Sequence, residues 1–501
     1  MSGREKWAIF VALLCIVSLT LAGCDQQAGP PGRTQPVDPY SLNGGGACVR
    51  LGAHPQAPYV NIQVSHDSYL AHSETMLVED PQNPLHLVGG SKFFTSPAHY
   101  RFQLGYFVSF DGGCTWRDGG LLPGFPSSTL TSDPSFAFGA QHLVYAAAVT
   151  AASATSSSSG IAVWTSRDGG RTFEAPVMVF NDTTGRIFSD KPWITADQRT
   201  GTLYVVWSYD HGASCGGAGY CQQELAFSRS TDQGRTFSPP QLIEGHAPFC
   251  TFAVRGRPPG STACDEALGA TPVVEPNGNI AVAFIYEDPL VRRSNASLLL
   301  VVTSADGGKT WTPPALAAHI HDVIGTFPPE KYRVASLPAF ARDPRTGQLY
   351  LAWADRRYGD ADVLLTTSKD GGRTWSAPLR VNDDAMKNGA QQFQPQLAVA
   401  PDGVVSVSFF DTRRDQQHKL IDVYLAQSID HAASFLPNVR VTTQNWDPAI
   451  DAPTDANGLK FIGDYQGLAA DNSFAHPFWN DTRTGSQQIF TAAVPSAQPP
   501  R

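Results

Sequence analysis

The stretch SFDGGCTW, residues 109–116, recurs along the chain and decides its fold. Close copies read SRDGGRTF at 166–173, STDQGRTF at 230–237, SADGGKTW at 304–311 and SKDGGRTW at 368–375. A worn copy, SIDHAASF at 428–435, has lost both glycines but keeps the serine, the aspartate and the aromatic residue. A repeat of about 60 to 70 residues suits one four-stranded blade of a β-propeller.

Each residue type in the repeat suits a tight hairpin turn. The aspartate can accept hydrogen bonds from backbone amides, and glycine permits the positive φ angles that such a turn requires. The closing Trp or Phe is expected to bury itself against a neighbouring sheet. Because a carboxylate engaged by turn amides is poorly placed for catalysis, we interpret the repeat as a structural element.

Short alternating or apolar runs flank the repeats and predict the remaining strands of each blade. Six copies predict at least six blades, and three more strands are expected near the C-terminus, at 464–469, 475–479 and 488–492. The alternating run 59–64 can supply their missing fourth strand. We therefore expect an all-β propeller of seven four-stranded blades, with six as the alternative. Pairing of the N- and C-terminal segments closes the ring and removes its exposed edges.

The N-terminus has the pattern of an export signal. Arg4 and Lys6 precede the apolar run 7–21, which is too short to span a bilayer comfortably. The run ends in LAGC, residues 21–24, which matches the bacterial lipobox. We expect lipidation of Cys24, with plain secretory cleavage as the alternative. The protein would then be exported and anchored by lipid to a bacterial membrane, in the periplasm or at the cell surface.

These features divide the chain into three parts. Residues 1–23 are expected to be a lipoprotein signal peptide and residues 24–57 a flexible tether that starts with the lipidated cysteine. The tether contains glycine and proline clusters and lacks hydrophobic periodicity. Residues 58–497 are expected to form the propeller that carries the repeated turns.

Six of the eight cysteines remain after Cys15 and Cys24 are set aside. An even number in an exported protein predicts disulfides. Separation along the chain favours two local pairs, which leaves a third pair that would join the tether to the first repeat. The candidates are Cys215 with Cys221, Cys250 with Cys264, and Cys48 with Cys114.

Composition excludes some partners. The net charge is −9 with 16% charged residues, and no basic stripe favours a nucleic acid. No residue spacing specifies a metal, so no metal site is assigned and no cofactor is expected to be required. Acidic loops such as Asp383-Asp384 offer the oxygen ligands that structural calcium would need. We expect a monomer.

Propeller topology separates a face that carries the repeated turns from a face formed by the B–C loops and the blade-to-blade connections. The second face is the candidate site. Three successive blades place an Asp-x-Arg unit there after strand B, which gives the substrate-binding candidates Arg356, Arg357, Arg413 and Arg483. Planar guanidinium groups bind carboxylates bidentately, so these units could bind one anion. Alternatively, each arginine pairs with a neighbouring carboxylate and locks blades together.

Acids and a tyrosine mark strand ends on the same face. Asp190 and the pair Asp464-Tyr465 enter strand A of their blades, and Glu287 leaves strand B. A tyrosine flanked by acids can act as a nucleophile or a general acid, and paired carboxylates serve glycosyl transfer. The alternative is that these aspartates cap turns.

The repeats resemble the Asp boxes of the sialidase (neuraminidase) superfamily and cover residues 58–494. The resemblance implies an exo-α-sialidase-like glycoside hydrolase that acts on acidic glycans. In that family an arginine triad binds the sugar carboxylate, a tyrosine nucleophile is assisted by a glutamate, and an aspartate is the acid/base. Carried over, Arg356 or Arg357, Arg413 and Arg483 form the triad, and the catalytic groups are Tyr465, Glu287 and Asp190, with Asp464 beside the tyrosine.

The chain departs from the family pattern in two ways. The Phe-Arg-Ile-Pro motif is absent, with Arg101 only a loose substitute, and seven blades are expected where catalytic sialidases have six. Two other functions therefore stay open: a non-catalytic glycan- or protein-binding scaffold, and a lyase acting on uronic-acid polysaccharides, which would need Tyr or His as base.

Overall fold

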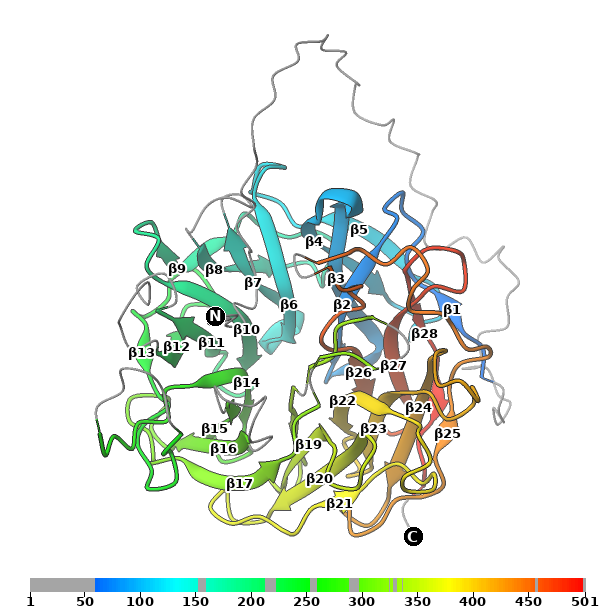
Figure 1. Ribbon diagram of the computed structural model, residues 1–501. Coiled ribbons are helices and arrows are strands. Elements are labelled where there is room, and N and C mark those ends of the chain that lie inside the picture. The colour runs from blue at the N-terminus through cyan, green and yellow to red at the C-terminus, as the bar shows by residue number, and fades with distance from the viewer. Residues whose placement is uncertain are drawn as a thin grey trace, which may run out of the picture.

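A computed structural model of the chain describes residues 59–151, 159–211, 222–252, 259–287, 297–323, 325–327, 331–335, 337–455 and 458–498. Their strands form seven antiparallel sheets arranged as blades around a central axis (Figure 1). This confirms the all-β propeller and the seven blades. Within the described residues, no helix is long and apolar enough to cross a membrane.

Each blade runs from an inner strand at the axis to an outer strand at the rim. Blade 1 contains β2 (His72–Asp80), β3 (Asn83–Ser96), β4 (Arg101–Ser109) and β5 (Arg117–Leu121); blade 2 contains β6 (Leu130–Phe138), β7 (Val144–Ala151), β8 (Ser159–Ser166) and β9 (Val177–Asp182); blade 3 contains β10 (Phe188–Ala196), β11 (Leu203–Asp210), β12 (Gln223–Ser230) and β13 (Gln241–Leu242). Blade 4 contains β14 (Ala267–Val274), β15 (Ile280–Tyr286), β16 (Ser297–Ser304) and β17 (Ala315–Ile320).

The last three blades follow the same order. Blade 5 contains β18 (Ala339–Arg342), β19 (Leu349–Asp355), β20 (Asp362–Ser368) and β21 (Leu379–Arg380), and blade 6 contains β22 (Gln392–Val399), β23 (Val405–Asp411), β24 (Asp422–Ser428) and β25 (Val439–Arg440). Blade 7 contains β26 (Gly467–Ala470), β27 (Phe474–Asp481), β28 (Gln488–Thr491) and, from the other end of the described chain, β1 (Ile62–Gln63); β29 (Val494–Pro495) also pairs with β27. Two short 3-10 helices, η1 (Pro97–His99) and η2 (Ala140–His142), lie in connections.

Strand β1 closes the ring as predicted, although it is shorter than the run 59–64. It pairs antiparallel with β28, with Ile62 opposite Thr491 and Gln63 opposite Phe490. The N–H of Val64 continues the pairing by donating to the carbonyl of Ile489, at 2.8 Å. The outer edge of β28 is therefore covered by the other end of the chain.

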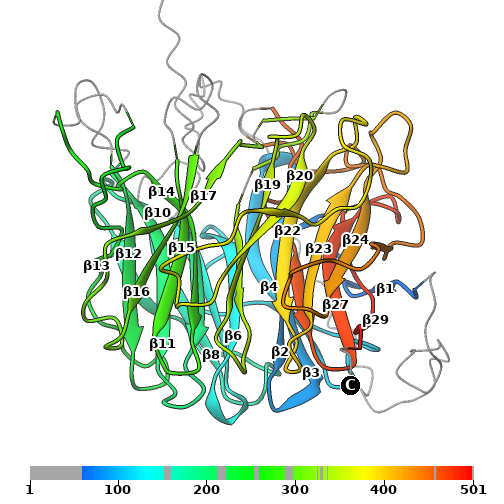
Figure 2. The ribbon, with the colours of Figure 1, turned by 90° about the horizontal axis from the view of Figure 1, so that it is seen from below.

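The repeated turns act as structural staples. In the fifth copy, Asp370 accepts hydrogen bonds from the backbone N–H and the hydroxyl of Thr374, at 2.9 and 2.6 Å, and the hydroxyl of Ser368 accepts the N–H of Gly372 at 2.9 Å. The Thr374 groups lower the pKa of Asp370 to about 2. All six turns join the third and fourth strands of their blades. Figure 2 shows the strands running between the two faces of the ring.

Candidate functional site at the propeller axis

The inner strands carry a repeated β-bulge near the end that faces the candidate site. In five blades the register between the first and second strands shifts around one bulged residue. The bulged residues have positive φ angles, and they are Glu74, Asp133, Lys191, Gly269 and Gln394. Such angles are costly for residues other than glycine and gather at functional sites. The bulges bring charged side chains together at the axis.

Lys191 is the centre of this charged cluster. Its Nζ lies 3.2 Å from Oδ1 of Asp133 and 2.9 Å from Oδ2 of Asp464, so that one ammonium group bridges blades 2, 3 and 7. Arg333, from the connection between blades 4 and 5, donates to Asp464 through Nε at 3.1 Å and Nη2 at 2.6 Å. Although burial alone would raise it, Arg333 and Lys191 hold the pKa of Asp464 well below its usual range.

The pKa of Asp190 is shifted in the opposite direction. Its carboxyl group is buried and accepts the backbone N–H of Lys191 at 2.9 Å. Burial and the neighbouring Asp133 raise the pKa of Asp190 well above its usual range. The surroundings therefore favour the protonated form of Asp190 and the ionised form of the nearby Asp464.

Glu74 and Lys92 form a second buried pair on the blade 1 side, with 2.7 Å between Oε2 and Nζ. Burial and Asp133 raise the pKa of Glu74 to about 7, against the attraction of Lys92. The Lys92 ammonium also lies over the rings of Phe102 and Phe461, 4.4 and 4.7 Å from their centroids. Glu74 can therefore exchange a proton near neutral pH.

Tyr465 lies beside the cluster at the wall of a cavity. Its ring packs edge-on against Trp193, with the centroids 5.9 Å apart, and Nζ of Lys191 lies 5.7 Å from its centroid. Burial, and then Glu74, raise the pKa of Tyr465 well above its usual value, so the phenol keeps its proton. The cavity is bounded by inner strands of blades 3 to 7 and is narrow, with a volume of about 20 Å³. Its polar lining includes Lys191, Gln396 and Asp464.

The structure thus brings together three of the predicted catalytic residues, Asp190, Asp464 and Tyr465. Glu287 lies elsewhere: it follows β15, the second strand of blade 4, where its N–H donates to the carbonyl of Glu266 at 2.8 Å. Glu74 is the glutamate that interacts with Tyr465. Sequence reasoning missed Glu74, Asp133, Lys191 and Arg333. The sequence signal for the first three is their equivalent place near the start of the inner strands of blades 1, 2 and 3.

Three of the four predicted substrate-binding arginines are held by the aspartate that ends their own strand. Nε of Arg357, Arg413 and Arg483 donates to Asp355, Asp411 and Asp481 at 2.9, 2.7 and 2.8 Å. Each guanidinium also reaches a residue that lies in or shortly after the outer strand of the preceding blade, namely His319, Asp383 and Thr443. These contacts are the blade-locking alternative, and they lie at the ends of second strands, one strand farther from the axis than Asp464.

Arg356 differs from these three. Its guanidinium lies over the ring of Phe327, 5.4 Å from the centroid, and it has no ion pair with any residue that the structure describes. Burial lowers the pKa of Arg356. A partly buried cation without a counter-ion is suited to binding an anionic group.

The cysteine predictions are tested in part. Cys250 and Cys264 form a disulfide, as predicted. Cys114 is also disulfide-bonded, and its partner lies outside the described residues. Cys24, Cys48, Cys215 and Cys221 lie outside them too, so lipidation and the other pairs remain predictions. The acidic pair named for calcium is engaged by arginines: Asp383 pairs with Arg413 and Asp384 with Arg380.

Comparisons with known proteins give similarities of fold. No protein-family profile matches the chain, and no curated protein matches it. A crystal structure of a protein of unknown function from Dyadobacter fermentans is 16% identical, with a TM-score of 0.49, and the match covers 75% of this chain and 97% of that one. The Hadza microbial sialidase Hz136 is 16% identical, with a TM-score of 0.45 and coverage of 83% and 74%.

A sialidase from Trypanosoma rangeli in complex with sialic acid is 12% identical, with a TM-score of 0.45, and the match covers 87% of this chain and 59% of that one. At these identities the likeness is one of fold. The chain is a seven-bladed β-propeller that is similar in structure to sialidases at low sequence identity.

Proposed function

We propose that the protein is an exported glycoside hydrolase of the exo-α-sialidase type, which cleaves acidic glycans at the propeller axis. The observation that carries the proposal is the pair of buried aspartates whose pKa values are shifted in opposite directions, Asp190 and Asp464, next to Tyr465 and the axial cavity. Environments that push the pKa values of two carboxyl groups apart are typical of acid/base sites.

The residues of the cluster fit distinct roles. The protonated Asp190 can give its proton to the leaving glycosidic oxygen. Tyr465 can attack the anomeric carbon as its phenolic proton passes to Glu74, whose pKa of about 7 suits a general base at neutral pH. Asp464, fixed by Lys191 and Arg333, stays ionised and can stabilise positive charge that develops on the sugar.

An acidic sugar is proposed because of Arg356. Its guanidinium is the one among the four candidate arginines that lacks an ion pair within the described residues, and it lies on the site face. A sugar carboxylate could supply the missing counter-charge.

The test is hydrolysis of a fluorogenic aryl sialoside by the purified protein, alongside aryl glycosides of neutral sugars and uronic acids. We expect Tyr465→Phe and Asp190→Asn to lower kcat at least 100-fold. Tyr209→Phe is the matched control, because Tyr209 lies one residue before the end of β11 on the same face and packs on Phe180 outside the cavity. Folded protein that cleaves none of these substrates would contradict the proposal.

A non-catalytic binding propeller is the second candidate, and the closed ion pairs of Arg357, Arg413 and Arg483 favour it. A glycan array that shows binding by protein without any hydrolytic activity would support this candidate. A rise in ultraviolet absorbance with uronic-acid polymers would instead reveal a lyase, since lysis leaves an unsaturated product.

We further propose that residues 1–23 direct export and that Cys24 carries the lipid anchor, on the basis of the lipobox. Mass spectrometry of the protein from bacterial membranes should find an acylated N-terminal Cys24. A Cys24→Ser variant should leave the membrane fraction. Membrane retention of that variant would contradict the anchor.

A further inference from the structure

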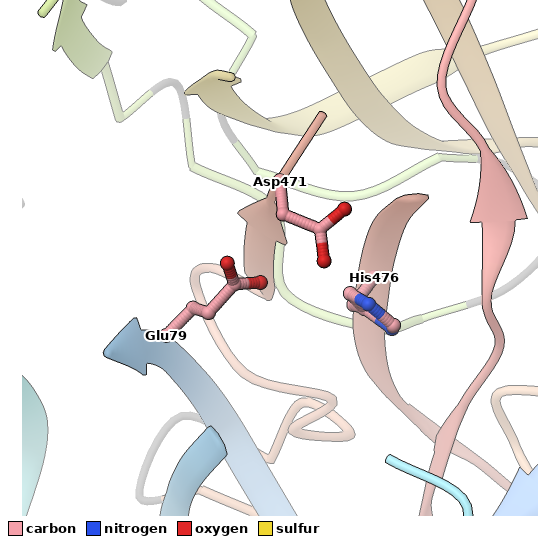
Figure 3. Close-up of side chains that lie close together, drawn as sticks. All are labelled: Glu79, Asp471 and His476. Atoms are coloured by element: carbon pink, nitrogen blue, oxygen red, sulfur yellow. The ribbon is translucent and has the colours of Figure 1, made fainter. Parts of the chain in front are cut away.

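A second group of reactive side chains lies on the opposite face, at the seam where blade 7 meets blade 1 (Figure 3). Glu79 lies near the end of β2, Asp471 directly follows β26, and His476 lies in β27. One carboxylate or imidazole atom from each of them lies within 4.8 Å of the other two. Asp471 and His476 are only 5% and 1% exposed. Three potential metal ligands therefore converge in a largely buried place.

The local structure holds two of these groups in position. Oδ1 of Asp471 accepts the backbone N–H groups of Ser473 and Phe474, at 2.5 and 2.7 Å, so the turn between β26 and β27 fixes this carboxylate. The imidazole of His476 packs under the first Asp box, where Nδ1 lies 3.7 Å from the position that a Cβ would take on Gly113. Figure 3 shows both carboxylates and the ring turned toward a common space. A site with so little freedom is already arranged for a ligand.

The other blades provide an internal control for this arrangement. An aspartate or glutamate at the position of Asp471 is common to the fold, since it recurs as Asp80, Asp197, Glu275 and Asp343. Glu79 and His476 are departures from the repeat. The position of Glu79 is occupied in the other blades, by strand register, by Phe138, Ala196, Val274, Arg342, Val399 and Ala470.

The position of His476 shows a similar departure. Its register equivalents are Val88, Tyr145, Tyr204, Ala281, Tyr350 and Ser406. In the seven blades, the carboxylate and the imidazole occur where the repeat otherwise has neither, and they come from adjacent blades to meet at one seam. A shared role explains why Glu79 and His476, the two residues that differ from the repeat, lie next to each other.

The donor set identifies the class of ligand. Two carboxylates that converge repel one another, and a cation bound between them relieves this repulsion. An imidazole nitrogen with two carboxylate oxygens suits a divalent transition metal, and zinc is commonly held by three protein ligands of these types with one open position. In a tetrahedral zinc site two nitrogen or oxygen donors are about 3.3–3.6 Å apart, so groups at the 4.8 Å limit would have to move about 1 Å closer to bind one ion.

We propose that Glu79, Asp471 and His476 bind one divalent transition-metal ion, for which Zn²⁺ is the reference, and that this ion fastens blade 7 to blade 1. The role is structural. The site lies on the face opposite the axial cluster, so it is independent of the proposed hydrolase activity. Nearly 400 residues separate Glu79 from its partners along the chain, which is why no residue spacing indicates a metal.

The test compares zinc content and thermal stability of the intact protein after dialysis against chelator and return of Zn²⁺. Elemental analysis should find one more zinc per chain in the wild type than in Glu79→Gln or His476→Gln. Zn²⁺ should raise the Tm of the wild type by several degrees and leave that of both variants unchanged. Glu275→Gln is the matched control, because Glu275 directly follows β14, the inner strand of blade 4, on the same face.

Glu79→Gln keeps the size of the side chain, so circular dichroism should show a folded variant, and His476→Gln provides a second one. The proposal would be overturned if wild type and variants held equal zinc, or if Zn²⁺ shifted the Tm of Glu79→Gln as much as that of the control. Stabilisation by Ca²⁺ as strong as that by Zn²⁺ would overturn the assignment to a transition metal.

Discussion

Hydrogen bonds and ion pairs determine the direction in which the pKa of each acid in the axial cluster is shifted. Asp190 and Asp464 are equally buried, yet Asp464 receives both Lys191 and Arg333, whereas the carboxyl group of Asp190 receives a single backbone N–H. Burial dominates in Asp190 and raises its pKa, and two cations outweigh burial in Asp464 and lower its pKa. The same residue type can therefore serve as acid and as anion a short distance apart.

Glu244 offers a test of how burial controls pKa away from the cluster. Burial raises its pKa to about 7, while its Oε2 accepts the N–H of Leu225 at 3.1 Å. Below pH 4.5 Glu244 is protonated in both the folded and unfolded chain. As the pH rises to 7 only the unfolded chain loses this proton, so the folded state is progressively destabilised, by a total on the order of 3 kcal/mol.

We therefore expect Glu244→Gln to stabilise the protein increasingly between pH 4.5 and 7, with no further gain above that range. Urea denaturation of wild type and variant at pH 5 and pH 8 measures the difference. Glu174→Gln is the control, because this side chain is 54% exposed in its ion pair with Arg167. A stability difference for Glu244→Gln that is the same at both pH values would refute the raised pKa.

The aspartates and the tyrosine of the site could be predicted because the sequence pattern alone shows which polar residues lie at strand ends. The pattern does not indicate Arg333, which reaches Asp464 from a connection 131 residues away. The arginines were visible too, but their partners decide their role. From the sequence, Arg413 is a candidate for binding an anion. In the structure its guanidinium is already paired with Asp411 and Asp383.

At the scale of the element, the Asp box is predictable because all its determinants are local. The hydrogen bonds of Asp370 stay within four residues, so the motif SKDGGRTW specifies its own turn. The worn sixth copy keeps the same geometry without glycine: His431 and Ala432 have φ angles of 59° and 61°, and Asp430 still accepts the hydroxyl of Ser434 at 2.6 Å. The bulges of the inner strands were not predicted, because they depend on how strands meet around the axis.

The worn box predicts a reciprocal pair of substitutions. Ala432→Gly should stabilise the protein by about 0.5–1 kcal/mol, because it relieves a left-handed conformation that costs more in alanine than glycine loses in flexibility. Gly372→Ala, at the equivalent position in blade 5, should destabilise by about 1–2 kcal/mol, since φ is 83° and the new Cβ would lie 3.1 Å from Val301. Chemical denaturation of both variants measures these changes, and destabilisation by Ala432→Gly would contradict the argument.

At the scale of the whole molecule, stability depends on closing the ring. Blades 1 to 6 each fold from one continuous segment, whereas blade 7 takes its outer strand from residues 62–63. The seam is reinforced by Asn61, whose amide donates to the carbonyl of Val441 at 2.9 Å and accepts the N–H of Thr443 at 2.8 Å. The six repeats predict a propeller. The closure of its ring by an N-terminal strand is indicated only by the alternating run near residue 60.

Two truncations isolate the contribution of this strand. A chain that starts at residue 59 keeps β1, and a chain that starts at residue 66 lacks it. Both chains lack Cys48, so Cys114 is changed to serine in each to make the two chains equal in their cysteines. The shorter chain loses the contacts of Asn61 and the hydrogen bonds of Ser65 with Gln488 and Ile489. We expect its Tm to fall on the order of 5 °C. Its uncovered β28 edge should promote association, which light scattering would detect; equal Tm values and monomeric behaviour of both chains would show that β1 is dispensable.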